Sequence, residues 1–362
     1  MRVLILSADI GEGHDAPARA LRDDILAQRP GAEVTIVDSM AAGGRLVQAL
    51  VRDRAEFVLR RLPWLFDLQY LLVARWGPSR RVAMRLASRL GRRGLLAAVR
   101  ESGADVVVAT YPPANQVLAV ERARGTLGVP LVSAITDLAA LRYWAHPGCD
   151  LHLVIHEESA AEVRAIAGAD ARIAHVRGLS AAAFGAPIDA AAARSALDLP
   201  PDVPVVTVSG GGWGVGDLRS AVEAAAAAAP DVRVVVLCGH NAALRRQLDE
   251  RFSHGGRVRT LGFTDRMPEV LAATDVLVHS TAGLTVQEAL VCGARVISYG
   301  WGVGHIRLNN DAYRRFGLAE VVTDDRALTG AIRRALDSPR APDLAYGRLP
   351  TAAEVVLALA GG

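Results

Sequence analysis

The sequence contains no lysine, so arginine supplies all 41 of its basic residues, and we attribute this to base-composition bias in the source genome. Cysteine is nearly absent as well. Cys149, Cys238 and Cys292 lie far apart and form no C-x-x-C pair, which excludes a disulfide framework and gives no sign of a zinc site. We therefore expect a reducing compartment and no bound metal.

Long hydrophobic runs are also missing. The apolar stretch at the N-terminus, Val3 to Leu6, is too short for a signal peptide, and no later run approaches the length of a membrane span. The sequence therefore predicts a cytoplasmic protein, which can still bind peripherally at the inner face of a membrane.

Acidic residues are scarce in one segment. Residues 45–100 carry thirteen arginines and three acidic residues, although the net charge of the whole chain is only +3. Within this segment, residues 62–72 include Trp64 and Phe66, and aromatic side chains beside arginines are typical of helices that lie on an anionic membrane. A buried apolar face with a solvated basic face would give the same pattern. Nucleic acid is not an expected partner, because aromatics make up only 5% of the chain and no nucleic-acid module is recognisable.

The composition is that of a folded protein with two domains, since 362 residues exceed one ordinary core and half of them are hydrophobic. Short β-branched runs alternate with alanine-rich stretches, as in parallel sheets wound with helices. We predict an N-terminal Rossmann-like domain over 1–178, a linker over 179–204, a C-terminal Rossmann-like domain over 205–345 and a tail over 346–362. The predicted strands are 3–7, 34–37, 105–109, 131–135, 151–155 and 173–176, followed by 205–209, 232–238, 258–261, 275–279 and 295–299.

A glycine loop follows the first predicted strand. Gly11, Gly13 and Ala16 satisfy the G-x-G-x-x-G/A fingerprint, and Asp38 ends the second strand where a ribose ligand is needed. An NAD-dependent oxidoreductase is therefore one interpretation. The fingerprint alone is weak, because any tight turn from strand to helix favours glycine.

Two further loops favour a nucleotide diphosphate in the second half. Gly211 and Gly212 lie in a glycine-rich loop between a strand and a helix, where backbone amides can hold a diphosphate. Later, the run 280–288 leads from a strand into a helix that carries Glu288 one turn inside. That carboxylate can accept both hydroxyls of a ribose. Open α/β sheets bind ligands at the carboxyl ends of their strands, so we expect the ligand between the two halves.

Three ordered motifs resemble one known family. They are 7–14 (Ser-Ala-Asp-Ile-Gly-Glu-Gly-His), 136–138 (Thr-Asp-Leu) with Trp144 and His146-Pro147 after it, and 282–288 (Ala-Gly-Leu-Thr-Val-Gln-Glu). Together they resemble the monogalactosyldiacylglycerol synthase and diacylglycerol glucosyltransferase family, which is similar to the glycosyltransferase that makes lipid II. The resemblance implies the GT-B fold, in which two Rossmann-like domains face each other. It also implies a UDP-sugar donor, inversion at the anomeric carbon and no metal cofactor.

The resemblance also assigns roles to residues. His14 matches the family's loop histidine and would be the general base, which suits a side chain with a pKa near neutrality. Glu12 and Asp15 could orient it, or could simply stabilise a helix start. The remaining expected contacts are Gly13, Asp137, Trp144, Trp64 and Phe66 for the acceptor, and Gly211, Gly212, Phe263, Ser280, Thr281, Ala282, Gly283, Leu284, Thr285, Glu288, His305 and Asn309 for the donor.

One motif departs from the family. Members usually have a glutamine and an acidic residue where this chain has His305 and Ile306, whereas Asn309 keeps its place. Loss of a carboxylate removes a strong acceptor for sugar hydroxyls, so the identity of the donor sugar stays open. His279 stands where a basic residue is common, and either a phosphate contact or a structural role fits it.

The sequence therefore predicts an inverting glycosyltransferase that moves a hexose from a UDP-sugar to a hydroxyl of a lipid such as diacylglycerol. The alternatives are transfer to a soluble natural product, UDP-sugar epimerisation on the same fold, oxidoreduction with NAD, and a non-catalytic homologue that only binds.

Overall fold

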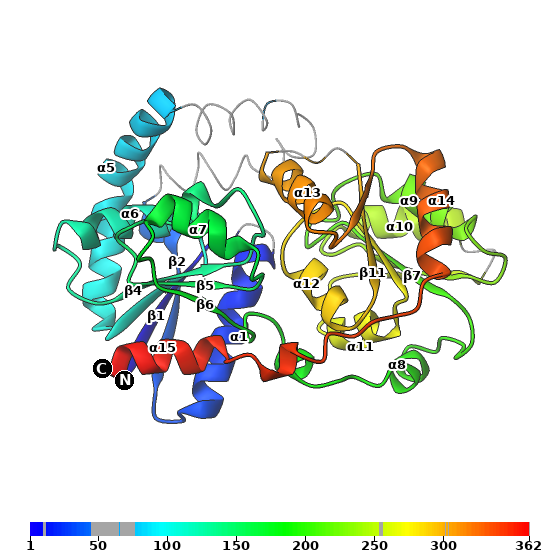
Figure 1. Cartoon of the computed structure of the whole chain (residues 1–362), viewed down its shortest axis with the longest axis horizontal. Helices are drawn as coiled ribbons and strands as arrows, with labels where there is room; N and C mark the ends of the chain where they lie inside the picture. Colours follow the sequence, from blue (N-terminus) through cyan, green and yellow to red (C-terminus); the bar gives the residue numbers. More distant parts are fainter. Residues whose placement is uncertain are drawn as a thin grey trace. The chain divides into compact units, whose positions relative to one another are not determined.

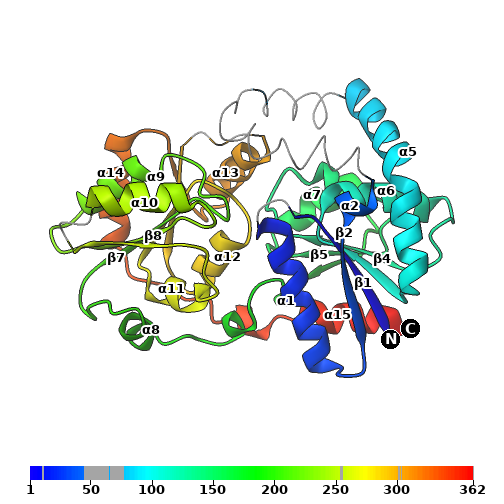
Figure 2. The same cartoon turned by 180° about the vertical axis from the view of Figure 1, so that it is seen from behind.

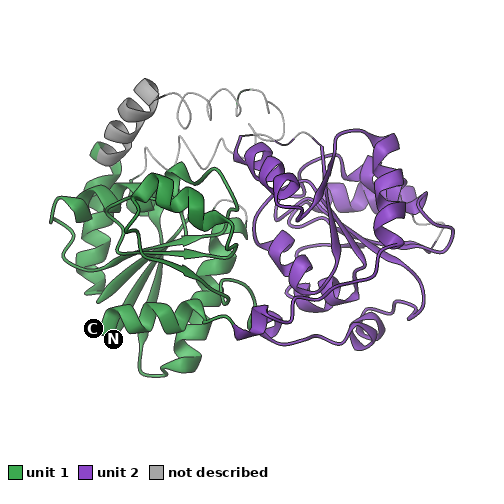
Figure 3. Ribbon diagram, in the orientation of Figure 1, with its two compact units in different colours: residues 1–182, 349–362 green, residues 183–348 purple. Residues whose placement is uncertain are grey.

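The computed structural model describes residues 1–9, 12–44, 65, 77–252, 256–300, 302 and 304–361. The predicted acceptor contacts Trp64 and Phe66 lie outside these residues, as does Gly11 of the first glycine loop. The chain divides into two units, which are coloured separately in Figure 3. Unit 1 comprises Met1–Ala182 and Leu349–Gly362, and unit 2 comprises Ala183–Arg348.

Unit 1 is built on a parallel sheet of six strands in the order β2-β1-β3-β4-β5-β6. Residues of β1, β3 and β4 are almost fully buried, because helices cover both faces of the sheet. Its elements are β1 (Arg2–Ser7), α1 (Glu12–Gln28), β2 (Glu33–Asp38), α2 (Ser39–Ala42), α5 (Gly77–Ser102), β3 (Val106–Ala109), α6 (Pro112–Ala123), β4 (Leu131–Ile135), a 3-10 turn (Leu141–Tyr143), β5 (Leu151–Val154), α7 (Ser159–Ala167), β6 (Ile173–His175) and α15 (Ala352–Gly361).

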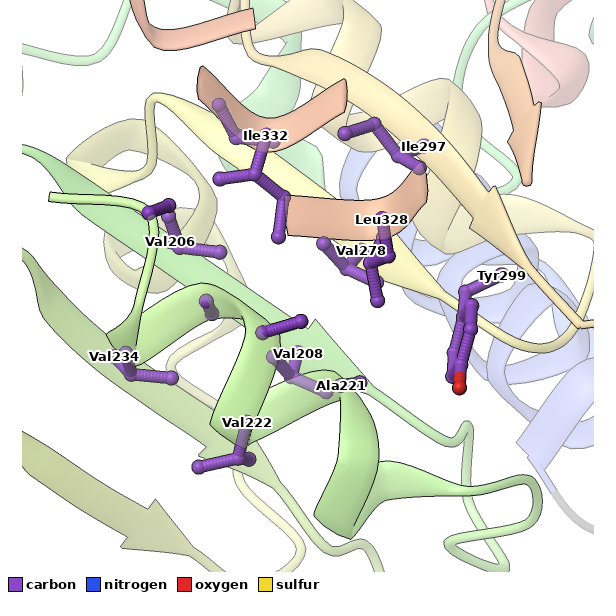
Figure 4. Packing of buried hydrophobic residues seen from close by; sticks show 14 of the residues in the cluster. Val206, Val208, Ala221, Val222, Val234, Val278, Ile297, Tyr299, Leu328 and Ile332 are labelled. Carbon is purple, nitrogen blue, oxygen red and sulfur yellow. The ribbon is translucent and has the colours of Figure 1, made fainter. Parts of the chain in front are cut away.

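Unit 2 repeats this architecture of a sheet surrounded by helices (Figure 2), with the strand order β12-β11-β10-β7-β8-β9, again all parallel. Figure 4 shows its core, in which valines of β7 and β10 pack against α9 and α14. Its elements are α8 (Ala190–Ala196), β7 (Val205–Ser209), α9 (Leu218–Ala226), β8 (Arg233–Leu237), α10 (Ala242–Phe252), β9 (Val258–Leu261), α11 (Met267–Ala273), β10 (Val276–His279), α12 (Leu284–Val291), β11 (Arg295–Tyr299), α13 (His305–Arg315), β12 (Glu320–Val322), α14 (Asp325–Leu336) and a short 3-10 turn at Tyr346–Arg348. Another 3-10 turn, Ala182–Gly185, begins at the last residue of the first piece of unit 1.

The C-terminal residues, expected to form a tail, fold as α15 and pack on α1 of unit 1 (Figure 1). Thr351 and Glu354 cap this helix reciprocally: the Thr351 hydroxyl accepts from the Glu354 amide at 3.0 Å, and the Glu354 carboxylate accepts from the Thr351 amide at 2.7 Å. Backbone bonds join the segment to Arg177, next to β6, at 2.7 and 3.1 Å. The last described residues are therefore part of the first unit.

All eleven predicted strands are present, so the prediction of two Rossmann-like parallel sheets is confirmed. Sequence reasoning missed β12, which has three residues and lies at the edge of its sheet. No helix among the described residues has both the length and the hydrophobicity that crossing a membrane requires.

Candidate active site

In unit 1, the predicted residues of the reaction centre gather at one edge of the sheet. The strands β1, β3 and β4 are neighbours and parallel, so the loops that follow them meet at their carboxyl ends. The first loop leads to His14 in α1, the second to Thr110 and Tyr111, and the third to Asp137 and Trp144.

His14 is half-buried and held in one tautomer. Its Nδ1 lies 2.8 Å from the carbonyl oxygen of Thr110, and a carbonyl can only accept, so Nδ1 carries the proton. In the neutral ring the lone pair is then on Nε2. The rings of Tyr111 and Trp144 lie 5.1 and 6.0 Å from the imidazole, the former at a T-shaped angle of 72°. Nε2 is thus the ring atom that can accept a proton.

The predicted acceptor contacts differ in how much surface they present. Gly13 is exposed in the first turn of α1, and a Cβ added there would meet no atom within 4 Å. Asp137 is half-buried and accepts a hydrogen bond of 2.8 Å from the indole nitrogen of Trp144. Trp144 itself is only 1% exposed. Open space therefore lies beside Gly13, and Trp144 forms a wall behind His14.

Both acidic residues near His14 have contacts of their own. Asp15 accepts a hydrogen bond from the Ser7 hydroxyl, and Glu12 pairs with Arg19 on the same helix. Burial raises the pKa of Asp15 above its ordinary value, although the bond from Ser7 acts in the opposite direction. Asp15 thus ties the start of α1 to the end of β1.

In unit 2, the glycine-rich loop after β7 packs directly on the residues that follow β10. The Ser280 hydroxyl donates to the carbonyl of Val215 at 2.6 Å. Gly211 and Gly216 have positive φ angles of 67° and 96°, and a Cβ on Gly216 would stand 2.6 Å from the Ser280 side chain. A Cβ on Gly211 would stand 3.2 Å from Thr281. The two predicted diphosphate-binding elements therefore form one surface.

The N-terminus of α12 has the geometry of an anion site. Gly283 is its N-cap with φ of 101°, and among the described residues no side chain is bonded to the amides of Leu284 and Thr285, which are therefore placed to bind an anion. Before it, Nδ1 of His279 donates to the carbonyl of Thr281, and Nε2 accepts from the Ser298 hydroxyl at 2.7 Å. Burial lowers the pKa of His279 to about 4. His279 is therefore a neutral structural residue that fixes the turn, which decides between the two roles considered for it.

Glu288 lies one turn inside α12 and is 8% exposed. Burial raises the pKa of its carboxyl group to about 7, and no described residue donates a hydrogen bond to it. A buried carboxylate without donors is costly, whereas the two hydroxyls of a ribose would supply them. The predicted contacts Ala282, Leu284 and Thr285 lie between this residue and the turn, around the helix start.

The predicted sugar contacts His305 and Asn309 lie in the first turns of α13, where the Asn309 amide donates to the carbonyl of His305 at 3.0 Å. Tyr313 of the same helix brings its hydroxyl within 3.5 Å of the Gly283 amide nitrogen, and its ring lies 6.0 Å from His279. The structure thus places α13 beside the start of α12. Ile306 is buried, so it does not replace the acidic residue found in the family.

Phe263 has a partner that sequence reasoning missed. The ring of His240 stacks on it at 4.3 Å between centroids and 14° between planes, and Phe263 is 51% exposed. The His240 amide also donates to the carbonyl of Gly212 at 2.8 Å, which links this pair to the glycine-rich loop. The signal in the sequence was the Cys238-Gly239-His240 run directly after a strand. An exposed aromatic pair beside a phosphate-binding loop suits a nucleobase.

A hollow of about 450 Å³ lies elsewhere in unit 2 and is lined by Glu223, Arg251, Phe252, Arg257 and Val258 among others. Val258 begins β9, so this hollow adjoins the amino ends of the strands rather than the carboxyl ends. Two of the lining residues, Glu223 and Arg251, form an ion pair with 2.6 Å between the guanidinium nitrogen and the carboxylate oxygen. It shares no residue with the predicted donor contacts. No cluster of three or more metal-ligating side chains occurs in the described part of the chain.

Comparisons with known proteins agree with both halves of this description. Residues 14–180 match the family model of monogalactosyldiacylglycerol (MGDG) synthase, and residues 205–338 match the model of glycosyl transferases group 1. Processive diacylglycerol beta-glucosyltransferases of Bacillus pumilus and Bacillus subtilis are each 24% identical over 330 residues, which is 89% of this chain and 83% of theirs.

Solved glycosyltransferases share the fold. One from Streptomyces sp. SF2575, complexed with thymidine diphosphate, has a TM-score of 0.61 with 16% identity and full coverage of both chains. A further solved structure, UGT89C1 of Arabidopsis thaliana complexed with UDP, has a TM-score of 0.54 with 16% identity over 93% of this chain and 91% of its own. An epimerase or an NAD-dependent oxidoreductase is not favoured by any of these similarities. The protein is thus a glycosyltransferase with the GT-B fold, and residues 14–180 match the domain model of the monogalactosyldiacylglycerol synthase family.

Proposed function

We propose that the protein transfers a hexose from a UDP-sugar to a hydroxyl of a diacylglycerol-like lipid, with inversion and without a metal cofactor. The observation that carries this proposal is the tautomer of His14, whose Nδ1–H is donated to Thr110 and whose Nε2 is therefore the basic atom. The names of the relatives support the lipid acceptor, since those proteins are diacylglycerol glucosyltransferases.

In the proposed reaction the acceptor oxygen attacks the anomeric carbon while the bond from that carbon to the β-phosphate oxygen breaks. The acceptor proton passes to Nε2 of His14, and UDP leaves with the bonding electrons. The amides at the start of α12 and in the glycine-rich loop stabilise the negative charge that develops on the diphosphate. The dipoles of these backbone amides thereby stabilise the charge that a metal ion stabilises in other transferases.

Roles in donor binding follow from position in unit 2. The ribose hydroxyls donate to Glu288, the base stacks on Phe263, and the sugar is held from α13 by His305 and Asn309. Gly211, Gly212, Ser280, Thr281 and Gly283 surround the diphosphate. On the acceptor side, Gly13 offers the space through which the hydroxyl approaches His14.

We also propose that the basic segment 45–100 holds the protein at an anionic membrane surface, which here would be the inner face of the cytoplasmic membrane. The thirteen arginines in this segment support the idea. Sedimentation with vesicles tests it: binding to vesicles with 30% phosphatidylglycerol that is lost at about 0.5 M salt is expected. Equal binding to neutral phosphatidylcholine vesicles would contradict it.

The transfer is tested by incubating the protein with radiolabelled UDP-glucose or UDP-galactose and diacylglycerol vesicles, and by measuring labelled lipid and released UDP. His14→Gln should lower the rate at least about a hundredfold, the size of a lost general base. His175→Gln is the matched control on β6 and should keep the wild-type rate. Transfer only to soluble alcohols would refute the lipid acceptor, and full activity of His14→Gln would refute the base.

A further inference from the structure

Both the backbone and the indole of Trp144 are held in place by hydrogen bonds. Its ring nitrogen donates to Asp137 at 2.8 Å, and its carbonyl accepts from the side chains of Asn115 and Ser133 at 2.6 and 2.8 Å. Asn115 and Ser133 are completely buried. Its amide donates to the carbonyl of Leu141 at 2.9 Å. The backbone of Trp144 is thus fixed by three bonds, and its indole, which is 1% exposed, is oriented by the bond to Asp137 with its ring 6.0 Å from the imidazole of His14.

The position of the indole bears on the charge of His14 after it has taken up a proton. The Thr110 carbonyl selects the tautomer but has no net charge. When Nε2 takes a proton the ring becomes a cation in a half-buried place, and a cation there needs compensation. An indole within about 6 Å of a cation attracts it, and a carboxylate bonded to the indole N–H adds negative charge to that ring. Asp137 is such a carboxylate.

We propose that Asp137 is a positioning residue for His14 that acts through Trp144. Asp137 fixes the indole, and the indole in turn fixes the plane of the imidazole and stabilises its protonated form. No proton moves to Asp137: the acceptor proton goes to Nε2 of His14, and Nδ1 keeps its own. This inference rests on the proposed function, in which His14 is the base.

Other titratable groups lie near these residues. Glu12 and Asp15 share α1 with His14, Tyr111 has its ring 5.1 Å from the imidazole, and Asp9 and Asp38 interact with Asp15 and Tyr111, respectively. Burial and the charge of Asp38 raise the pKa of Tyr111 far above its usual range, so this hydroxyl stays neutral. Asp15 is bonded to Ser7 and Glu12 to Arg19. These groups are identical in all the variants below, so differences among the variants report on Asp137 and Trp144.

The test is a double-mutant cycle. Asp137→Asn keeps an oxygen that can accept the indole N–H but removes the charge, and Trp144→Phe keeps an aromatic wall but removes the N–H. Each single variant should lower kcat about tenfold with the KM for UDP-sugar within about twofold, because the donor site is untouched. If Asp137 acts through the indole, Asp137→Asn in the Trp144→Phe background should cost less than about twofold.

A direct readout is the pKa of His14, followed by NMR on the imidazole in folded protein. It should fall in Asp137→Asn and in Trp144→Phe, because both remove stabilisation of the cation. The matched control is Asp150→Asn, which removes a half-buried carboxylate of the same unit that is bonded to Arg122 at 2.8 Å. This control should melt earlier, while the pKa of His14 and kcat remain as in the wild type.

Two outcomes would overturn the inference: additive effects of the two substitutions on kcat, or an unchanged pKa of His14 in Asp137→Asn. Either is distinct from failure of the proposed function. If His14→Gln is fully active, the base itself is wrong, whereas an inactive His14→Gln beside a normal Asp137→Asn refutes only the positioning role.

Discussion

Replacing Glu288 by glutamine should make the free protein more stable and the donor site weaker. The carboxyl group is 8% exposed, and burial raises its pKa from 4.5 to about 7. At 1.36 kcal/mol per pH unit, keeping it ionised above pH 7 costs the fold roughly 3 kcal/mol. A neutral amide of the same shape avoids that cost.

The sign of the pH dependence follows from the raised pKa. The folded state binds a proton more tightly than the unfolded chain, so the stabilisation is complete below pH 4.5 and is lost as the pH rises through about 7. Glu288→Gln should therefore melt like the wild type at pH 4.5 and higher than it at pH 8. For a unit of this size, roughly 3 kcal/mol corresponds to a rise in Tm of about 5–10 °C.

UDP binding should respond in the opposite sense. Ribose hydroxyls donate to the ionised carboxylate, so binding favours that form, and the affinity of the wild type should fall up to about tenfold per pH unit below pH 7. The affinity for UDP can be measured for both proteins by calorimetry. Protonation of the UDP phosphate affects both proteins equally, so a difference between them reports protonation of Glu288. The affinity ratio between wild type and Glu288→Gln should therefore shrink as the pH falls.

Glu250→Gln, at an exposed glutamate of α10, is the matched control and should change neither Tm nor UDP affinity. A Glu288→Gln protein that melts no higher than the wild type at pH 8, or that binds UDP equally well at every pH, would refute the reasoning.

Four further predictions concern other residues. Gly13→Ala should stabilise α1 by up to about 1 kcal/mol in urea unfolding, since the added methyl meets no atom within 4 Å. It should nevertheless raise the KM for the acceptor alone, and an unchanged KM would show that the acceptor does not approach there. Phe263→Ala should weaken UDP binding on the order of tenfold without loss of Tm, because the ring is 51% exposed, whereas Phe316→Ala should leave binding unchanged. Transfer should persist in 10 mM EDTA, and its abolition with recovery on adding Mg²⁺ or Mn²⁺ would refute metal independence. Acid should weaken the fold, because burial lowers the pKa of His156 to about 3 and of His279 to about 4. A depressed folded pKa means that stability present above pH 6.5 is lost as the pH falls, by up to about 2 kcal/mol per histidine at pH 5, and His156→Gln should flatten the dependence in denaturant titrations.

The strands could be predicted because most are short β-branched runs, and those at the centres of the sheets, such as β3, β4 and β7, are buried along their whole length, so they differ visibly from the alanine-rich helices between them. The motif around Glu288 could be located because a predicted strand is followed there directly by a predicted helix. The prediction missed β12 because three residues at a sheet edge give too short a pattern.

Contacts between distant loops could not be predicted from the sequence. His279 is neutral because it is buried, and it is oriented by Ser298, its partner in the β10–β11 register, and that register is a property of the sheet. The stack of His240 on Phe263 joins loops after two neighbouring strands, 23 positions apart in the chain. The buried state of Glu288 likewise depends on how neighbouring elements cover α12.

The return of α15 to unit 1 has a consequence for biosynthesis. Unit 2 is one uninterrupted stretch, whereas unit 1 is made of two pieces that flank it. A ribosome therefore synthesises all of unit 2 before it synthesises α15, which completes unit 1. Until residues 349–361 emerge, the side of α1 that α15 covers lacks its partner, and a chaperone that recognises apolar surface would find it there on nascent chains.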